Sequence, residues 1–68
     1  MKPTSPADEH RAEFLELCDQ LLKGSAEMRN HAMKPGNAWL ARGELSKINT
    51  LMNELETTLD KIKAADEA

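Results

Sequence analysis

The sequence contains little of what small proteins use to close a fold or to build a sheet. Its one cysteine, Cys18, excludes an internal disulfide, and together with His10 and His31 it falls short of the four ligands of a structural zinc site. Tyrosine and valine are absent, and Phe14 and Trp39 are the only aromatic residues. Because strands favour β-branched and aromatic side chains, this composition argues against a β-sheet.

Long apolar runs are also missing. The chain passes from Met1, Lys2 and Pro3 directly into polar residues, without the apolar core of a signal peptide. No stretch is long enough to span a bilayer. A lone cysteine agrees with a reducing compartment. We therefore expect a cytoplasmic protein that has no membrane partner.

The residues that are present are suited to helices. Hydrophobic residues make up 40% of the 68 positions and charged residues 31%, a balance typical of a folded helical protein. A chain of this length forms one domain at most and is marginally stable alone. Such scaffolds are commonly stabilised by a disulfide, a metal or oligomerisation, and oligomerisation is what remains here. We expect a single domain over residues 1–68, with residues 1–4 and 65–68 frayed.

The first helix is expected over about residues 6–33. Ser5 is suited to the N-cap, Pro6 to the first helical position, and Asp8 completes a capping box. Apolar and small residues then recur in steps of three and four, as in an amphipathic helix. This stripe consists of Phe14, Cys18, Leu21, Ser25, Met28 and Ala32, widened by Leu15, Leu17 and Leu22. Gly24 marks either a kink or a place where another helix comes close.

Residues 34–37 form the one strong break between helices. Pro35 cannot continue the helical hydrogen bonds, Gly36 accepts a left-handed conformation, and Asn37 offers an N-cap for the next helix. This second helix is expected over about residues 38–64. Its apolar residues repeat with heptad spacing, and they are Leu45, Ile48, Met52, Leu55, Leu59 and Ile62.

Two helices joined by so short a loop fold back antiparallel. The stripe of the first helix is wider than one neighbour covers, and burying the remainder is worth about 1.5–3 kcal/mol per side chain. We expect an all-α, two-helix antiparallel hairpin that pairs into a homodimeric four-helix bundle; in general shape this resembles small plasmid-encoded hairpin dimers. The residues expected in the core and the self-association surface are Phe14, Leu17, Cys18, Leu21, Met28, Leu45, Ile48, Met52, Leu55, Leu59 and Ile62.

Charge is distributed unevenly along the chain. Residues 21–50 contain five basic and two acidic residues, a net charge of +3, whereas the two flanks contain four basic and ten acidic residues, a net charge of −6. The loop end of the hairpin is therefore expected to be basic and the open end acidic. The candidate partner-binding residues near the loop are Trp39, Arg29, His31, Lys34, Arg42 and Lys47. Trp39 either anchors a partner or packs on Met28, Met33 or Leu40.

No group of residues has the pattern of a catalytic or cofactor site. Cys18 and His31 are more than three helical turns apart, so we expect an inert core thiol. His10 and His31 are too distant to share a metal, and the Glu-x-x-His pattern of di-iron bundles does not occur. A slim bundle offers no dry pocket in which a carboxylate becomes a general acid. We expect no catalytic residue, no cofactor and no metal.

The function expected is that of a small non-enzymatic interaction module. It would self-associate and bind or regulate a larger protein, as adaptor, accessory or inhibitor proteins do, including those encoded by phages or plasmids. One alternative is a regulatory nucleic-acid-binding dimer that presents the basic loop end to phosphates. The net charge of −3 for the whole chain argues against this alternative. Another is a structural subunit of a larger assembly.

Overall fold

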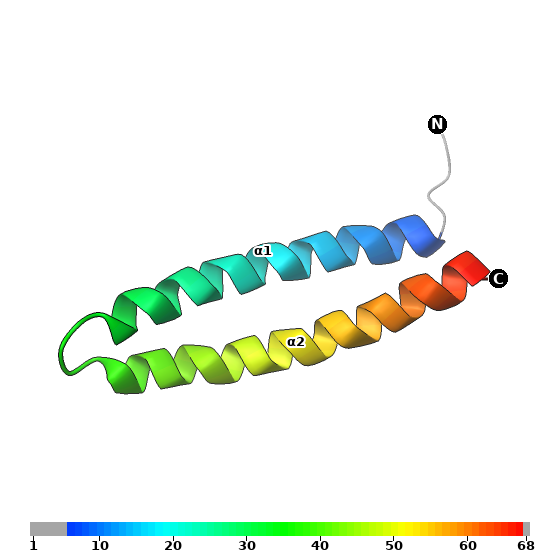
Figure 1. Cartoon of the computed structure of the whole chain (residues 1–68). Helices are drawn as coiled ribbons and strands as arrows, with labels where there is room; N and C mark the ends of the chain where they lie inside the picture. The colour runs from blue at the N-terminus through cyan, green and yellow to red at the C-terminus, as the bar shows by residue number, and fades with distance from the viewer. Residues whose placement is uncertain (1–5, 68) are drawn as a thin grey trace.

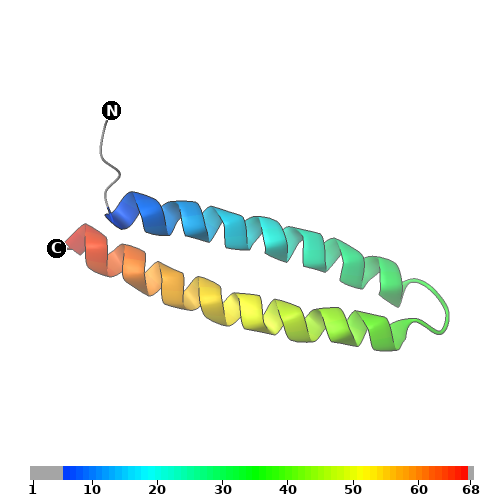
Figure 2. The ribbon, with the colours of Figure 1, turned by 180° about the vertical axis from the view of Figure 1, so that it is seen from behind.

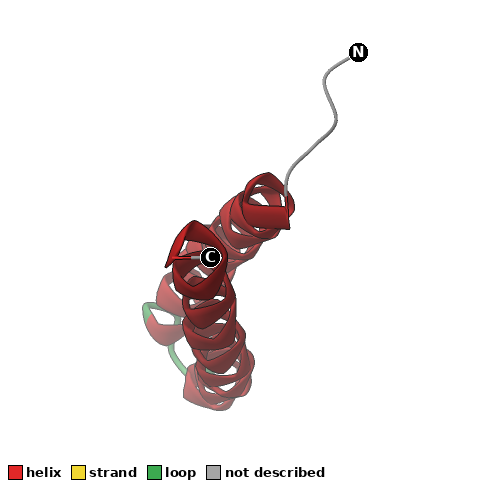
Figure 3. Cartoon of the chain, turned by 90° about the vertical axis from the view of Figure 1, so that its right-hand side faces the viewer, coloured by secondary structure: helices red, strands yellow, loops and turns green. Residues whose placement is uncertain are grey.

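The chain folds as a helical hairpin. The computed structural model describes residues 6–67, in which α1 spans Pro6–Ala32 and α2 spans Ala38–Glu67. The two helices lie side by side and run in opposite directions, and the start of α1 lies near the end of α2 (Figures 1 and 2). Within this range both segments are helices and none is a strand (Figure 3). The predicted all-α hairpin is confirmed.

The start of α1 follows from its first residues. Pro6 occupies the first helical turn, where its missing N–H removes no hydrogen bond, and Asp8 and Glu9 face the positive end of the helix dipole. Ser5, the predicted N-cap, lies outside the described residues. The helix ends at Ala32, one residue before the predicted end.

The connection is a tight turn built on Pro35 and Gly36. The backbone N–H of Asn37 donates to the carbonyl of Lys34 at 3.2 Å, and Gly36 has a φ of +82°. Proline at the second position and a positive φ at the third are the signature of a type II turn. α2 starts at the next residue, and the carbonyl of Asn37 accepts from the N–H of Leu40 at 3.0 Å. Asn37 therefore holds the predicted N-cap position.

α2 continues three residues beyond its predicted end, so residues 65–67, which we expected to be frayed, are helical. Two contacts account for this. Ala65 is half-buried, and Asp66 forms an ion pair with Arg11 of α1. Both side chains of the pair are close to half exposed, so the pair contributes at most about 1 kcal/mol.

The helices meet along one line of residues with heptad spacing, which we name the seam. Every seam position is buried or half-buried. The seam consists of Ala7, His10, Phe14, Leu17, Leu21, Gly24, Met28 and His31 in α1, and of Ala41, Glu44, Ile48, Leu51, Leu55, Thr58, Ile62 and Ala65 in α2. Over residues 6–67 the buried positions are Leu17, Ala41, Ile48 and Thr58. The hairpin thus has a thin core.

Gly24 faces α2 in the seam. A Cβ added there would make ordinary van der Waals contact with α2, at 3.6 Å from Cγ1 of Ile48 and 4.0 Å from Oε2 of Glu44. α1 is helical on both sides of this position. Gly43 differs, because a Cβ there would meet nothing within 4 Å.

The seam differs from the two stripes that apolar spacing predicts. Seven residues of the two predicted stripes are exposed and lie outside the contact between the helices, and these are Leu15, Leu22, Ser25, Ala32, Leu45, Met52 and Leu59. Leu45, Met52 and Leu59 were predicted for the core or the self-association surface, and their part in self-association stays a prediction. The remaining stripe residues do lie in or beside the seam. In place of the exposed residues, the seam passes through small or polar residues that apolar periodicity does not select, among them Gly24, Ala41, Glu44 and Thr58.

The positions of Gly36 in the turn and Gly43 in α2 predict opposite effects of an alanine substitution on stability. Gly36→Ala should lower the free energy of unfolding by about 1–2 kcal/mol, because alanine is strained at positive φ. Gly43→Ala should raise it by up to about 1 kcal/mol, because this exposed helical position has space for a methyl group. Urea denaturation followed by circular dichroism checks both, and equal changes at the two sites would contradict the turn assignment.

The seam also predicts the result of placing a charge between the helices. Leu55→Asp should cost at least about 3 kcal/mol, because a carboxylate replaces a half-buried leucine facing α1. Asn53→Asp, on the exposed surface of the same helix, is the matched control and should change stability by less than about 0.5 kcal/mol. Retention of full helicity and stability by Leu55→Asp would show that the seam is misplaced.

Candidate protein-interaction surface

One side of the hairpin carries exposed apolar side chains from both helices. This apolar face consists of Leu15, Cys18 and Leu22 in α1 and Leu45, Met52 and Leu59 in α2. Its leucines and methionine are 45–70% exposed, and Cys18 is half-buried. Each of the six directly follows a seam residue in the sequence. Because equivalent positions of two antiparallel helices lie on the same side of their plane, the six share one face.

Two grooves on this side support that placement. The first joins both helices near the loop and is lined by Met28, Arg29, Ala32, Ala38, Ala41, Arg42 and Leu45. The second lies further along α2 and is lined by Leu21, Asn49, Met52, Asn53, Leu55, Glu56 and Leu59. The apolar face is therefore ridged and not flat, as helix packing surfaces are.

The opposite side of the hairpin is polar. Its grooves are lined by residues that mostly precede a seam residue, among them Glu13, Gln20, Lys23, Glu27, Lys47, Thr50, Glu54, Thr57 and Lys61. At this edge the Thr58 hydroxyl, in a side chain only 1% exposed, lies 2.9 Å from the carbonyl oxygen of Glu54 and 3.3 Å from Oε1 of Glu13. Thr58 is thus satisfied inside the seam, and the two sides of the hairpin differ sharply in polarity.

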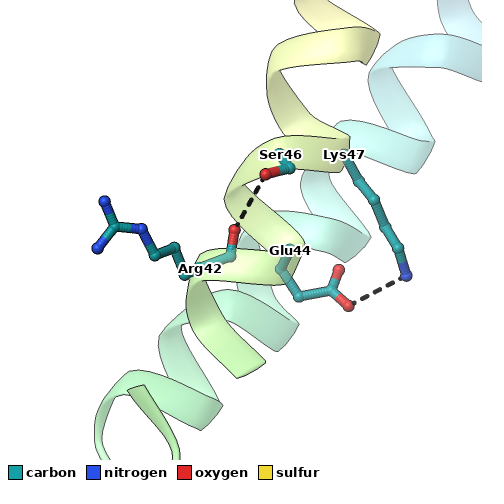
Figure 4. Close-up of polar contacts among 4 residues, drawn as sticks. All are labelled: Arg42, Glu44, Ser46 and Lys47. Atoms are coloured by element: carbon teal, nitrogen blue, oxygen red, sulfur yellow. Dashed lines mark hydrogen bonds and ion pairs between the residues drawn. The ribbon is translucent and has the colours of Figure 1, made fainter. Parts of the chain in front are cut away.

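The basic residues predicted to bind a partner do not share one surface. Nζ of Lys47 lies 3.5 Å from Oε1 of Glu44, whereas the side chain of Arg42 extends to the other side of α2 (Figure 4). Arg42 and Arg29 line the groove beside the apolar face, and Lys47 lines a groove of the polar side. A continuous strip of positive charge for a phosphate backbone is not formed by these three residues.

The loop end, residues 33–39, forms an exposed tip. Trp39 is 70% exposed and Met33 is 75% exposed, so the alternative in which the tryptophan ring packs within the end of the hairpin is wrong. Lys34 is exposed in the turn between them. The tip therefore combines an accessible aromatic ring, a flexible apolar side chain and a positive charge.

His31 is the predicted partner-binding residue that faces inward. It occupies the last seam position of α1, and its Nδ1 atom is buried without a hydrogen-bond partner. An unpaired buried polar atom costs about 1–3 kcal/mol. The buried Nδ1 atom of His31 therefore weakens the loop end of the seam.

Nothing in the described part of the chain has the geometry of a metal site. No group of three His, Cys, Asp or Glu side chains among residues 6–67 is arranged to hold a metal ion. Over the same residues, neither helix combines the length and the apolar composition needed to cross a bilayer.

Comparison of the chain with protein-family models, curated proteins and solved structures found no match.

The unpaired nitrogen predicts a stabilising substitution. His31→Leu should raise the free energy of unfolding by about 1–2 kcal/mol, because it removes a buried polar atom and adds apolar contact in the seam. His10→Leu, at a seam position without such an unpaired buried atom, should raise the free energy of unfolding by a smaller amount. Urea titrations at equal protein concentration check the pair, and a loss of stability in His31→Leu would show that Nδ1 has a partner in solution.

Proposed function

We propose that this chain is a small, non-enzymatic, cytoplasmic interaction module that self-associates and binds or regulates a larger protein. The observation that carries the proposal is the apolar face, where five large aliphatic side chains are 45–70% exposed on one side of the hairpin. Soluble monomers rarely expose large contiguous apolar patches, and such patches mark interaction sites. The half-buried free thiol of Cys18 agrees with a reducing location.

The free energy available from this face is of the same order as the cost of association. Covering a half-exposed leucine or methionine is worth about 1 kcal/mol, so the ten such side chains of two copies provide about 10 kcal/mol. The loss of translational and rotational freedom costs about 4–15 kcal/mol. The two magnitudes are comparable, which supports a dimer that responds to concentration.

The tip supplies a second, separate surface for the larger partner. Trp39 is 70% exposed at the start of α2, and tryptophan is enriched among residues that dominate binding energy. The exposed Met33 offers an adaptable contact, and Lys34 favours an acidic neighbourhood on the partner. Self-association and partner binding thus use different residues.

A nucleic-acid-binding dimer is the second candidate. Arg29 and Arg42 line one groove near the loop, which favours it. The placement of Lys47 on the other side and the net charge of −3 disfavour it. We rank it below protein binding for these two reasons.

Copurification from the host tests the proposal. The tagged full-length chain should retain a protein partner after nuclease treatment, and Trp39→Ala should weaken the interaction at least tenfold by removing the anchor ring. Ser46→Ala, at an exposed position two turns further along α2, is the matched control and should retain the partner. Mass spectrometry identifies what is retained.

Salt dependence separates the two candidates. A complex with nucleic acid through several phosphates loses about 10³–10⁵-fold in affinity between about 50 and 200 mM salt, whereas a tip anchored by Trp39 should lose far less. Recovery of nucleic acid alone, with this steep salt dependence, would overturn the proposed function in favour of the second candidate.

A further inference from the structure

We propose that the apolar face binds the same face of a second copy of this chain, across a two-fold axis near Cys18 and Met52. The axis places the two loops at opposite ends of a four-helix bundle, so that α1 lies against α1 and α2 against α2 of the second copy. This inference rests on the self-association in the proposed function and adds its surface, axis and orientation.

The spacing of the face is self-complementary about these two residues. In α1, Leu15 and Leu22 lie three residues before and four residues after Cys18. In α2, Leu45 and Leu59 each lie seven residues from Met52. Rotation about a two-fold axis near Cys18 and Met52 brings Leu15 against Leu22 of the second copy. The same rotation brings Leu45 against Leu59 of the second copy. A two-fold interface requires such self-complementarity.

The shape of the face accommodates a second helix pair. The groove lined in part by Leu21, Met52, Leu55 and Leu59 lies beside the proposed axis and forms an apolar hole for a side chain of the second copy. On α1 the neighbouring positions of the same side are small or modest in size, namely Cys18 and Ser25. Close approach of the helices near the axis is therefore sterically open.

Charge selects the orientation. Among the described residues the hairpin divides into a loop half, residues 21–50, with a net charge of +3, and an open half, residues 6–20 and 51–67, with three basic and ten acidic residues and a net charge of −7. With the loops at opposite ends, each basic half lies over an acidic half. With the loops at the same end, like charges would face each other along both halves. On α1 itself, Arg29 in the last turn comes near the acidic first turn of the second copy, which contains Asp8 and Glu9.

Sedimentation equilibrium over a range of concentrations tests the surface. The wild-type chain should form a dimer, and Leu22→Glu should weaken it at least 100-fold because it places a charge on the apolar face. Gln20→Glu, on the exposed polar side of α1, adds the same charge two residues away and should dimerise like the wild type. Circular dichroism confirms that both variants remain helical above their dissociation constants.

Oxidative cross-linking of the native thiol tests the axis and the orientation. Mild oxidation should join Cys18 of two copies in a disulfide, which requires Cα atoms within about 7 Å. In a Cys18→Ser background, Met52→Cys should also self-cross-link, whereas Ala26→Cys should not. A dimer in which neither Cys18 nor Met52→Cys cross-links would overturn the axis, and dimerisation unchanged by Leu22→Glu would overturn the surface.

The two-fold dimer and the binding of a partner protein are separate proposals, and each can be contradicted without the other. A wild-type chain that stays monomeric at high concentration, or assembles into open arrays, overturns the two-fold proposal even when the tip captures a protein that Trp39→Ala releases. A dimer that forms as described while no protein is captured overturns partner binding and leaves the two-fold interface supported.

Discussion

Two helices can share only one line of contact, and this constraint governs the whole molecule. The hairpin measures 51 × 24 × 11 Å along its principal axes, which is about one helix in thickness. A side chain in such a single layer is either in the seam or near water. The core is accordingly thin, with Leu17, Ala41, Ile48 and Thr58 as the buried residues of the described chain. The apolar face is the direct result, because its side chains adjoin the seam but have no helix above them.

The helices and the turn were predictable because their signals are local. Pro35, Gly36 and Asn37 define the turn through backbone preferences that need no tertiary information, and the structure places them as predicted. The end of α2 was not predictable in this way. Residues 65–67 are helical where Ala65 and Asp66 meet α1, and such contacts between residues distant in the sequence leave no local signal.

The position of the seam was harder to predict for a different reason. Each helix has two adjacent stripes rich in apolar residues. Each position of one stripe directly follows a position of the other in the sequence, so the stripes are about 100° apart around the helix axis. Apolar spacing selected the stripe containing Leu45, Met52 and Leu59, whereas the helices pack through the stripe containing Glu44 and Thr58. Close packing favours small or well-paired residues, which hydrophobicity alone does not reveal. All six residues of the apolar face were singled out from the sequence, as part of the stripes expected to form the core and the self-association surface.

The predicted binding residues near the loop separated for the same reason. Arg42 and Lys47 are five residues apart, which corresponds to about 140° around α2, so closeness in the sequence did not bring them onto one surface. His31 turned inward because its position continues the seam of α1. Trp39 remained outward because it follows neither stripe. A charge count over a segment predicts a basic end, but the phase of each helix decides which charges act together.

The length of the hairpin has a consequence for how its tip works. In the proposed dimer, the loops at opposite ends would place the two tryptophans at opposite ends of a rod about as long as one hairpin, 51 Å. Such a dimer would be bivalent. A target that repeats its docking site at a matching distance gains avidity from simultaneous engagement, while a target with a single site, or with sites too close together, does not. The fixed distance between the two tryptophans would therefore favour partners whose binding sites have a matching spacing.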